Sequence, residues 1–398
     1  MAGVELFFFY LLAGAAPLSI AAINAALGGL TLFFLFRLVT GKWRPPLPAW
    51  IFVAWFAWAA VCALFSPLRS EALDGILNFW SWTAFLTATA IPYGIREKYA
   101  RWAAYLAISM LLTLPASLTQ FFLGTDIFHK QALRQAVPPG TVNGYGFFSH
   151  HLTYGGSMTV GACVLAGLLL YGPARGRILQ GAGVAAGLGG LFTSLARSYL
   201  VGSVLAVPVL FWPKGRKRVI QAVAALVVVV LLLALLGPAP VRSRFRAIGD
   251  MSNPSNAERI YLWKAVLRQI ADRPVLGWGP GTYQTTAEPY KAPYARFIKY
   301  PNRPPGFRTM EHCHNLYLMV AQQTGIPGLL LFLGFLAVAV RAILRQPDPA
   351  LKWGVLAAMS AFFVGALFED NGGDVEVATL IFFLMGLASA GPPEEGTS

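Results

Sequence analysis

Long apolar runs follow one another along most of this chain, and they constrain its fold more than any other feature. A helix needs about 20 apolar residues to cross a bilayer, and twelve runs approach that length. Charged residues make up only 12% of the 398, whereas about a quarter of the residues in a soluble domain are charged. We therefore predict an all-α polytopic membrane protein with about twelve transmembrane helices.

The first run, Val4–Phe36, is long enough for two helices that divide near Pro17, because proline breaks a helix interior. The ten other predicted spans are Pro48–Phe65, Ile76–Ile95, Ala103–Leu123, Leu152–Tyr171, Ile178–Ala196, Ser198–Trp212, Val219–Leu236, His314–Leu344, Trp353–Phe368 and Val375–Ala390. The tenth span overall, His314–Leu344, is too long for one straight crossing, and we expect it to break at Gly325-Ile-Pro-Gly.

The only long polar segment, about 76 residues from Pro238 to Cys313, separates the ninth span from the tenth. We therefore divide the chain into helices 1–9 (residues 1–237), a large loop domain (238–313), and helices 10–12 with a tail (314–398). With the N-terminus inside, the inner loops carry fifteen Lys and Arg and the short outer loops only four. The positive-inside rule then places the large loop outside, which is the periplasm of a Gram-negative cell.

The net charge of +14 does not predict a nucleic-acid partner, because basic inner loops are expected of a membrane protein for topological reasons. The large loop is a separate matter, since long loops escape that rule. It holds twelve Lys and Arg against five Asp and Glu. This excess suggests an anionic partner at the outer leaflet, or simple attraction to anionic lipid headgroups.

A helix is predicted within the loop from Ser255 to Ala271. Apolar residues recur at helical spacing along it, and Ser255 with Glu258 forms a capping-box pattern. Arg259 is the exception, because its neighbours three and four positions on are Leu262 and Trp263. We interpret Arg259 as an anion-binding residue, with a snorkelling side chain as the alternative. A glycine-rich tight turn, Leu276-Gly-Trp-Gly-Pro-Gly, is expected after this helix.

Arg197 lies in the short outer turn Thr193-Ser-Leu-Ala-Arg-Ser-Tyr, with no acidic residue within twenty positions. An arginine at this depth needs a counter-charge or water, and a ligand phosphate or lipid headgroups would both serve. His314 opens the tenth span, and imidazole is well suited to proton transfer near neutral pH. A structural, hydrogen-bonded role for His314 stays open.

No metal or other cofactor is predicted. His312 and His314 stand without a third His, Cys or acid cluster nearby in the sequence, so a zinc site is not favoured. Cys62, Cys163 and Cys313 are scattered and predict no disulfide framework. An acidic outer turn contains Glu369, Asp370, Asp374 and Glu376. Paired carboxylates can perform acid–base chemistry, but we interpret this turn as the acidic, translocation-permissive side of the protein.

Several of these stretches together resemble the O-antigen ligase and O-antigen polymerase superfamily of bacterial envelope enzymes, in one order, over about Gly144–Leu344. The pieces are Phe147-Phe-Ser-His-His-Leu, Ser194-Leu-Ala-Arg-Ser-Tyr, Glu258-Arg-Ile-Tyr-Leu-Trp, Pro274-Val-Leu-Gly-Trp-Gly-Pro-Gly-Thr-Tyr, His314-Asn-Leu-Tyr-Leu and Thr324-Gly-Ile-Pro-Gly. The resemblance implies a GT-C-like glycosyltransferase architecture, with one partly helical periplasmic loop between helices 9 and 10.

The resemblance also implies an activity. The ligases transfer O-antigen polysaccharide from undecaprenyl pyrophosphate to lipid A–core at the periplasmic face of the inner membrane, completing lipopolysaccharide. The implied catalytic residues are His314, Arg259 and Arg197. The implied substrate-binding residues are Arg197, Arg259, His151, Tyr199 and Asn315. The resemblance implies no metal at this site, and membrane lipids would be further partners of the protein. The size of the chain and the position of the loop favour the ligase; an O-antigen polymerase and a lipid-linked oligosaccharide flippase or exporter are the alternatives.

Overall fold

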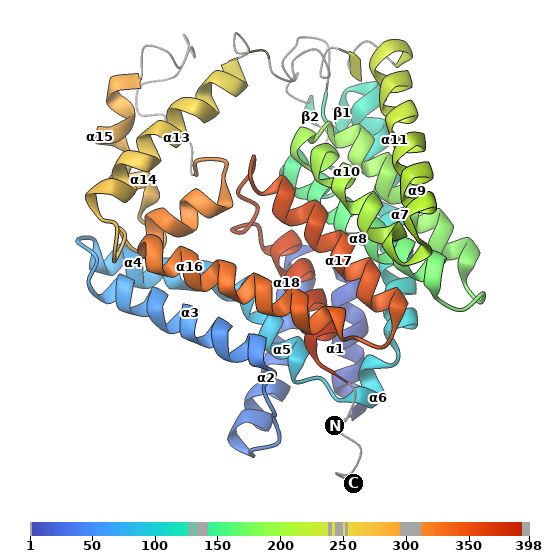
Figure 1. Ribbon diagram of the computed structural model, residues 1–398, viewed down its shortest axis with the longest axis horizontal. Coiled ribbons are helices and arrows are strands. Elements are labelled where there is room, and N and C mark those ends of the chain that lie inside the picture. The colour runs from blue at the N-terminus through green and yellow to red at the C-terminus, as the bar shows by residue number, and fades with distance from the viewer. Residues whose placement is uncertain are drawn as a thin grey trace.

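The structure, a computed structural model, describes residues 2–126, 131–132, 142–237, 241–242, 250, 254–294 and 312–391. It is mostly helical, as predicted, with one short strand pair, β1 (Thr125–Asp126) and β2 (Gln131–Ala132). The long helices are α1 (Ala2–Ala15), α2 (Ile20–Val39), α3 (Leu47–Leu64), α7 (Tyr99–Leu123), α8 (His151–Tyr171), α9 (Arg177–Ser194), α10 (Arg197–Phe211), α11 (Arg216–Leu236), α13 (Pro254–Asp272), α16 (Leu316–Leu344), α17 (Pro349–Gly365) and α18 (Val375–Ser389) (Figure 1).

Six of the described helices are long and apolar enough to cross a membrane. They are α2, α3, α7, α8, α11 and α16; α1, α17 and α18 are apolar but shorter. The structure therefore confirms an all-α membrane protein, and the count of twelve crossings stays a prediction. The division of Val4–Phe36 is confirmed, since α1 ends at Ala15 and α2 begins at Ile20.

The predicted span Ile76–Ile95 is wrong as a single helix. It forms a 3₁₀ helix, η1 (Ile76–Thr83), followed by the short helices α5 (Ala84–Thr89) and α6 (Tyr93–Arg96); α4 (Arg69–Gly75) precedes it. Pro92 separates α5 from α6, because it has no N–H to continue the ladder. At the other end, a Cβ added to Gly75 would meet the Pro280 carbonyl oxygen at 2.2 Å. The loop therefore presses on this segment where it turns.

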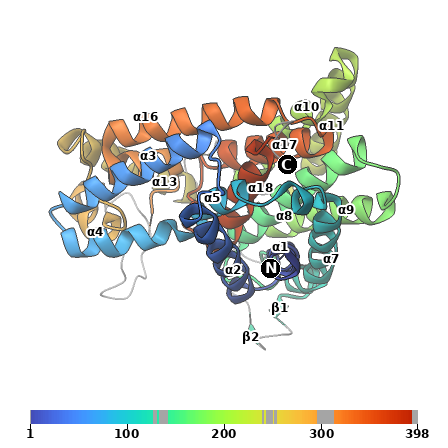
Figure 2. The same ribbon diagram turned by 90° about the horizontal axis from the view of Figure 1, so that it is seen from below.

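An aromatic cluster fills the centre of the bundle. Trp55 and Trp82 stack with ring centroids 5.0 Å apart, and Phe382 stacks on Trp82 at 4.7 Å. The helices around this cluster come from distant parts of the sequence: α16 lies beside α3, and α17 lies between α8 and α10 (Figures 1 and 2). Large buried rings of this kind carry most of the apolar area in a core.

The break predicted at Gly325 is confirmed, and it is the place where the loop attaches. Gly325 has φ 69° and ψ −179° inside α16, a conformation open almost only to glycine. The break leaves backbone groups of the preceding turn without helical partners. The loop supplies them: Trp278 N donates to Gln322 O at 2.8 Å, and Gly279 N donates to Gln323 O at 3.0 Å. Buried backbone groups are thus satisfied across the junction.

The described part of the loop packs on α16 as a small second core. The helix predicted at Ser255–Ala271 is confirmed as α13, and the glycine-rich turn follows it, with positive φ at Gly277, Gly279 and Gly281. Two short helices, α14 (Tyr283–Thr286) and α15 (Glu288–Lys291), and the 3₁₀ turn η3 (Ala292–Tyr294) come next. The residues of this core are Leu262, Val266, Tyr283, Ala287, Cys313 and Met319.

Candidate active site

Three polypeptide segments meet above the start of α16. They are the first half of α13, the short stretch before α16, and the turn between α17 and α18. Arg259, His314 and Glu369 come from these three segments in that order, and 55 positions separate His314 from Glu369. The loop core fixes the first segment: Trp263, on α13, donates its indole N–H to the Cys313 carbonyl oxygen at 3.0 Å.

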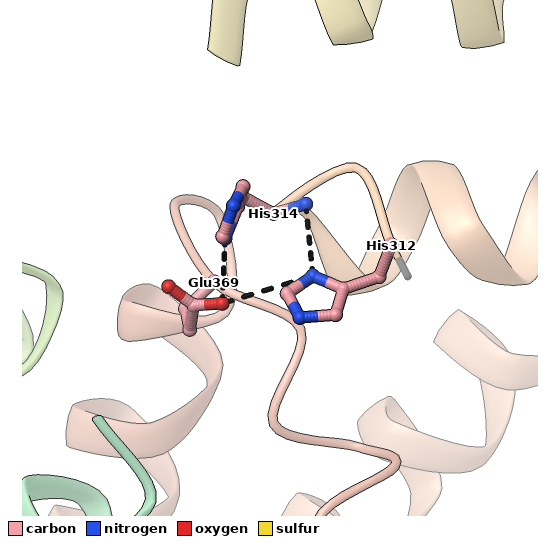
Figure 3. Close-up of side chains that lie close together, drawn as sticks. All are labelled: His312, His314 and Glu369. Carbon is pink, nitrogen blue, oxygen red and sulfur yellow. Dashed lines mark hydrogen bonds and ion pairs between the residues drawn. The ribbon is translucent and has the colours of Figure 1, made fainter. Parts of the chain in front are cut away.

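Glu369 links the predicted base to one of the predicted arginines. The His314 Nδ1 lies 2.8 Å from Glu369 Oε1, and Arg259 Nη2 lies 3.5 Å from Glu369 Oε2. Figure 3 shows His314 and His312 facing this carboxylate. The Glu369 side chain is 2% exposed, so its charge is held by these neighbours and not by water. The expected approach of Arg259 to His314 is therefore present, with a carboxylate between them.

The carboxylate is ionised. Burial alone would raise its pKa, but the charge and hydrogen bond of His314, with His312 and Arg259, hold the pKa of Glu369 well below its usual range. A carboxylate only accepts hydrogen bonds, so His314 Nδ1 carries a hydrogen and donates it to Glu369. In the neutral imidazole this leaves a lone pair on Nε2.

His312 is neutral beside this pair. Burial lowers the pKa of His312 to about 4; the charge of Glu369 opposes this shift, and the charges of His314, His150 and Arg259 add to it. Its Nδ1 also accepts a hydrogen bond from the backbone N–H of His314 at 3.3 Å, which an imidazolium nitrogen does not do. The 3.8 Å separation of His312 Nδ1 from Glu369 is thus a close approach of two acceptors. His312 holds the backbone of His314 in place.

Two non-glycine residues have positive φ in the described ranges, and both lie next to predicted catalytic residues. They are His314 itself, at 55°, and Leu195, at 53°, two residues before Arg197. Such conformations cost roughly 1–3 kcal/mol and cluster at functional sites. The local backbone is therefore bent, at a cost, at both places from which a predicted catalytic side chain projects.

Arg197 begins α10 and is half-buried. Its turn lies at the same end of the bundle as the His314–Glu369 pair, as two contacts show. His151 Nδ1 is 2.8 Å from the carbonyl oxygen of Ser194, and a Cβ added to Gly365, at the end of α17, would lie 3.4 Å from the Ser198 carbonyl oxygen. Glu369 follows Gly365 by four residues. The structure thus places Arg197 and His151 on the side of the bundle that carries the pair.

The other predicted substrate-binding residues make structural contacts. Asn315 caps α16: its side chain accepts from Leu318 N at 2.9 Å and donates to Leu367 O at 3.0 Å. Tyr199 is 1% exposed and packs beside Phe362, with ring centroids 6.5 Å apart. Their binding of substrate stays a prediction.

One ligand atom each from His312, His314 and Glu369 lie within 4.8 Å of one another, and such a set can hold a metal ion. The sequence argument against a metal was that no third ligand stands near the two histidines, and the fold supplies one in Glu369. That argument is therefore wrong. Arg259 gives a better one, because its guanidinium already places a cation 3.5 Å from the same carboxylate. The expectation of a metal-free site now rests on Arg259.

Glu369 was missed as a site residue because it was interpreted only as part of an acidic turn. A usable signal was present: Glu369 directly follows an apolar span and emerges on the side assigned to His314. The neighbouring Cys313 is unsuited to chemistry, since it is fully buried and burial raises the pKa of its thiol well above the ordinary value. The arrangement therefore offers a carboxylate-oriented imidazole base with an arginine beside it.

Residues 182–333 match the family model described as O-Antigen ligase. This interval contains Arg197, Arg259 and His314, and it ends before Glu369. No curated protein matches the chain. The match over residues 182–333 confirms the resemblance to the O-antigen ligase and polymerase superfamily that the motifs indicated.

Proposed function

We propose that the protein is an O-antigen ligase, which transfers O-antigen polysaccharide from undecaprenyl pyrophosphate to lipid A–core at the periplasmic face of the inner membrane. The observation that carries this proposal is the contact of His314 with Glu369 at 2.8 Å, with Arg259 on the other oxygen of that carboxylate at 3.5 Å. The family match supports a glycosyltransferase class and a lipid-linked sugar partner.

The reaction is a direct displacement that inverts the anomeric centre. The acceptor hydroxyl oxygen forms a bond to the anomeric carbon while the bond from that carbon to the pyrophosphate oxygen breaks. The hydroxyl proton goes to Nε2 of His314, whose other nitrogen stays hydrogen-bonded to Glu369. Glu369 orients the ring and stabilises the imidazolium that forms, as the carboxylate does in a serine protease triad.

The leaving pyrophosphate needs positive charge and no proton. Guanidinium groups bind phosphate oxygens in pairs and stay charged, so Arg259 and Arg197 take the place that a divalent cation fills in other phosphate chemistry. Donors fixed in advance where charge develops are usually the largest catalytic contribution. Transfer should therefore persist in EDTA, and a loss of activity that a divalent metal restores would refute this part of the proposal.

The direct test is complementation of a strain that lacks its own ligase, with Arg197→Ala, Arg259→Ala and His314→Ala each expressed to the wild-type level. Losing one charge-assisted phosphate contact of about 1.5–3 kcal/mol should slow ligation roughly ten- to a hundred-fold. Losing the base should cost about 10²- to 10⁴-fold. Full activity of any one variant would remove that residue from the mechanism.

A second experiment separates this function from its alternatives. The purified protein is incubated with lipid-linked donor alone or with donor and lipid A–core, and the products are separated by size. A ligase consumes lipid A–core, a polymerase lengthens the donor without it, and an exporter moves donor across a vesicle membrane without forming a glycosidic bond.

A further inference from the structure

A cavity of about 560 Å³ lies at the opposite end of the bundle from α13 (Figure 1). Three segments that are far apart in the sequence line it: the start of α1, the end of α2 with the turn that follows, and the stretch from Pro92 to Lys98. Its volume falls within the range of about 300–1,000 Å³ that is usual for ligand pockets. The candidate active site does not use this cavity, so its chemistry needs a separate explanation.

The charged side chains of the lining give it a positive balance. They are Arg37, Lys42 and Lys98 against the single carboxylate of Glu5. Arg37 and Glu5 neutralise each other, because Nη1 and Nη2 of Arg37 donate to the two Glu5 oxygens at 2.6 Å each. The ammonium groups of Lys42 and Lys98 make no hydrogen bond or ion pair within the described part of the chain. Two cations that face one cavity without a carboxylate of their own favour an anionic ligand.

The remaining wall is largely apolar and lies at the end of a membrane helix. Phe33 and Phe36 of α2 and Leu6 of α1 contribute to it. Helix α2 is long and apolar enough to cross a membrane, and Arg37 lies in its last turn. Phe36 is 43% exposed, and the Lys42 ammonium group lies 5.8 Å from the centroid of its ring. Cations and apolar rings thus face one cavity at the level where lipid headgroups meet their acyl chains.

We propose that this cavity binds one anionic phospholipid of the adjacent leaflet, with its phosphate at Lys42 and Lys98 and its acyl chains against Phe33 and Phe36. Basic pockets between membrane helices suit such headgroups. A soluble phosphate ion would leave the phenylalanine wall uncovered, and a zwitterionic lipid would bring its own cation to the lysines. The charge bias of the loops predicts that this leaflet is the cytoplasmic one. The inference is independent of the proposed function.

The test removes both lysine charges from the cavity and compares the result with the same loss elsewhere. The cavity pair is Lys42→Gln with Lys98→Gln, and the control pair is Lys217→Gln with Lys352→Gln, in α11 and α17. The control positions do not line the cavity, and each pair joins one exposed and one half-buried lysine. Substitutions at such positions seldom unfold a protein. General attraction of anionic headgroups to basic loops should weaken equally in both pairs, whereas a site in the cavity is lost only in the first.

Lipid binding to the full-length protein in an uncharged detergent is measured by native mass spectrometry. The protein is titrated with phosphatidylglycerol, with phosphatidylcholine of the same chains, or with glycerol phosphate, which has the headgroup but no chains. We expect one phosphatidylglycerol to bind the wild type more tightly than phosphatidylcholine does. At about five-fold for each lysine near a headgroup, the cavity pair should raise its Kd about 25-fold, and the control pair should change it by less than about two-fold. Glycerol phosphate at equal concentration should not displace the lipid.

Equal losses in the two pairs, or equal binding of phosphatidylglycerol and phosphatidylcholine, would overturn the inference. Displacement of the lipid by glycerol phosphate would identify a site for soluble phosphate and overturn the lipid assignment.

The acidic segment after Gly391 is the competing occupant. Arg96, beside the cavity residue Ile95, donates to the Gly391 carbonyl oxygen at 2.9 Å, and Glu394 and Glu395 follow in the sequence. We expect Glu394→Gln with Glu395→Gln to bind phosphatidylglycerol as the wild type does. If the lipid binds that variant and not the wild type, the acidic segment occupies the cavity and the inference fails.

Discussion

Replacing Glu369 by glutamine tests whether this carboxylate assists His314. The substitution keeps the shape of the side chain and removes the charge that His314 and Arg259 share. At the observed 2.8 Å, a carboxylate and an imidazolium attract each other by about 6 kcal/mol at an effective dielectric constant near 20. That figure is an upper value, because the cost of burying the charges has to be subtracted.

The corresponding carboxylate-to-amide change in a protease triad lowers kcat about 10⁴-fold, which is roughly 5.5 kcal/mol. We therefore expect Glu369→Gln to lower kcat for transfer about 10²- to 10⁴-fold. The assay is product formation by the purified variant from saturating lipid-linked donor and lipid A–core. Folding is checked first by thermal unfolding in detergent, because removing one member of a buried ion pair can itself cost about 3–5 kcal/mol.

Glu376→Gln is the matched control. It is the same substitution at a buried acidic residue, 6% exposed, in the first turn of α18 and seven residues from Glu369. It makes no hydrogen bond or ion pair to His314 or Arg259. We expect wild-type kcat from Glu376→Gln. The reasoning is refuted if folded Glu369→Gln transfers sugar at a rate within a few-fold of this control.

Three further outcomes follow from other contacts. Arg259→Lys keeps the charge but loses the planar fork, so ligation should slow about ten-fold, whereas the exposed Arg268→Lys on the same helix should ligate normally. The folded pKa of His312 is lowered from 6.5 to about 4, so His312 contributes stability above pH 6.5, and this contribution is lost as pH falls through about 4. Thermal unfolding of His312→Gln should therefore show a smaller loss of unfolding free energy on acidification, by at most about 3 kcal/mol before solvent screening of the partly exposed ring is subtracted. Gly325→Ala should destabilise the protein by more than about 2 kcal/mol in thermal unfolding, because φ is positive and the new Cβ would lie 2.0 Å from the Val275 carbonyl oxygen. Gly334→Ala in the same helix has open space around it, so thermal unfolding should show a neutral or slightly stabilising effect.

Local sequence patterns predicted the parts of the fold that depend on local physics. Most apolar runs became helices near the expected bounds, since hydropathy and helix length are properties of each run alone. The break at Gly325 was predictable for the same reason. Ile76–Ile95 was not, because its apolar composition is that of a straight span, and its turns are set by Pro92 and by the loop that presses on Gly75. Hydropathy carries no information about that contact.

The residues of the candidate site also fall into those that local sequence patterns predict and those that they do not. Arg259 was predicted from its place on the apolar side of a helix, and α13 confirms the helix. For Glu369 the sequence indicated only the side of the membrane, because nothing near it in the sequence shows that it lies 2.8 Å from a histidine 55 positions earlier. The role of His312 was hidden similarly, since its effect passes through a hydrogen bond to the backbone of His314. Groups that act by positioning others become visible only when the chain is folded.

The break in α16 explains how a polar loop can hold Arg259 at a fixed distance from a base that directly precedes a membrane helix. His314 stands two residues before α16, and the loop attaches eight to twelve residues further along, through the carbonyl oxygens of Gln322 and Gln323 and the N–H of Ile326. From there the buried Gln322 side chain joins Gln269, at the end of α13, at 3.1 Å. The base just before α16 and the support of the arginine are therefore both attached to the first part of this helix, ahead of its break. An unbroken α16 would use those backbone groups internally and leave the loop without its attachment, so the break is a condition for the site and not only a bend in a long span.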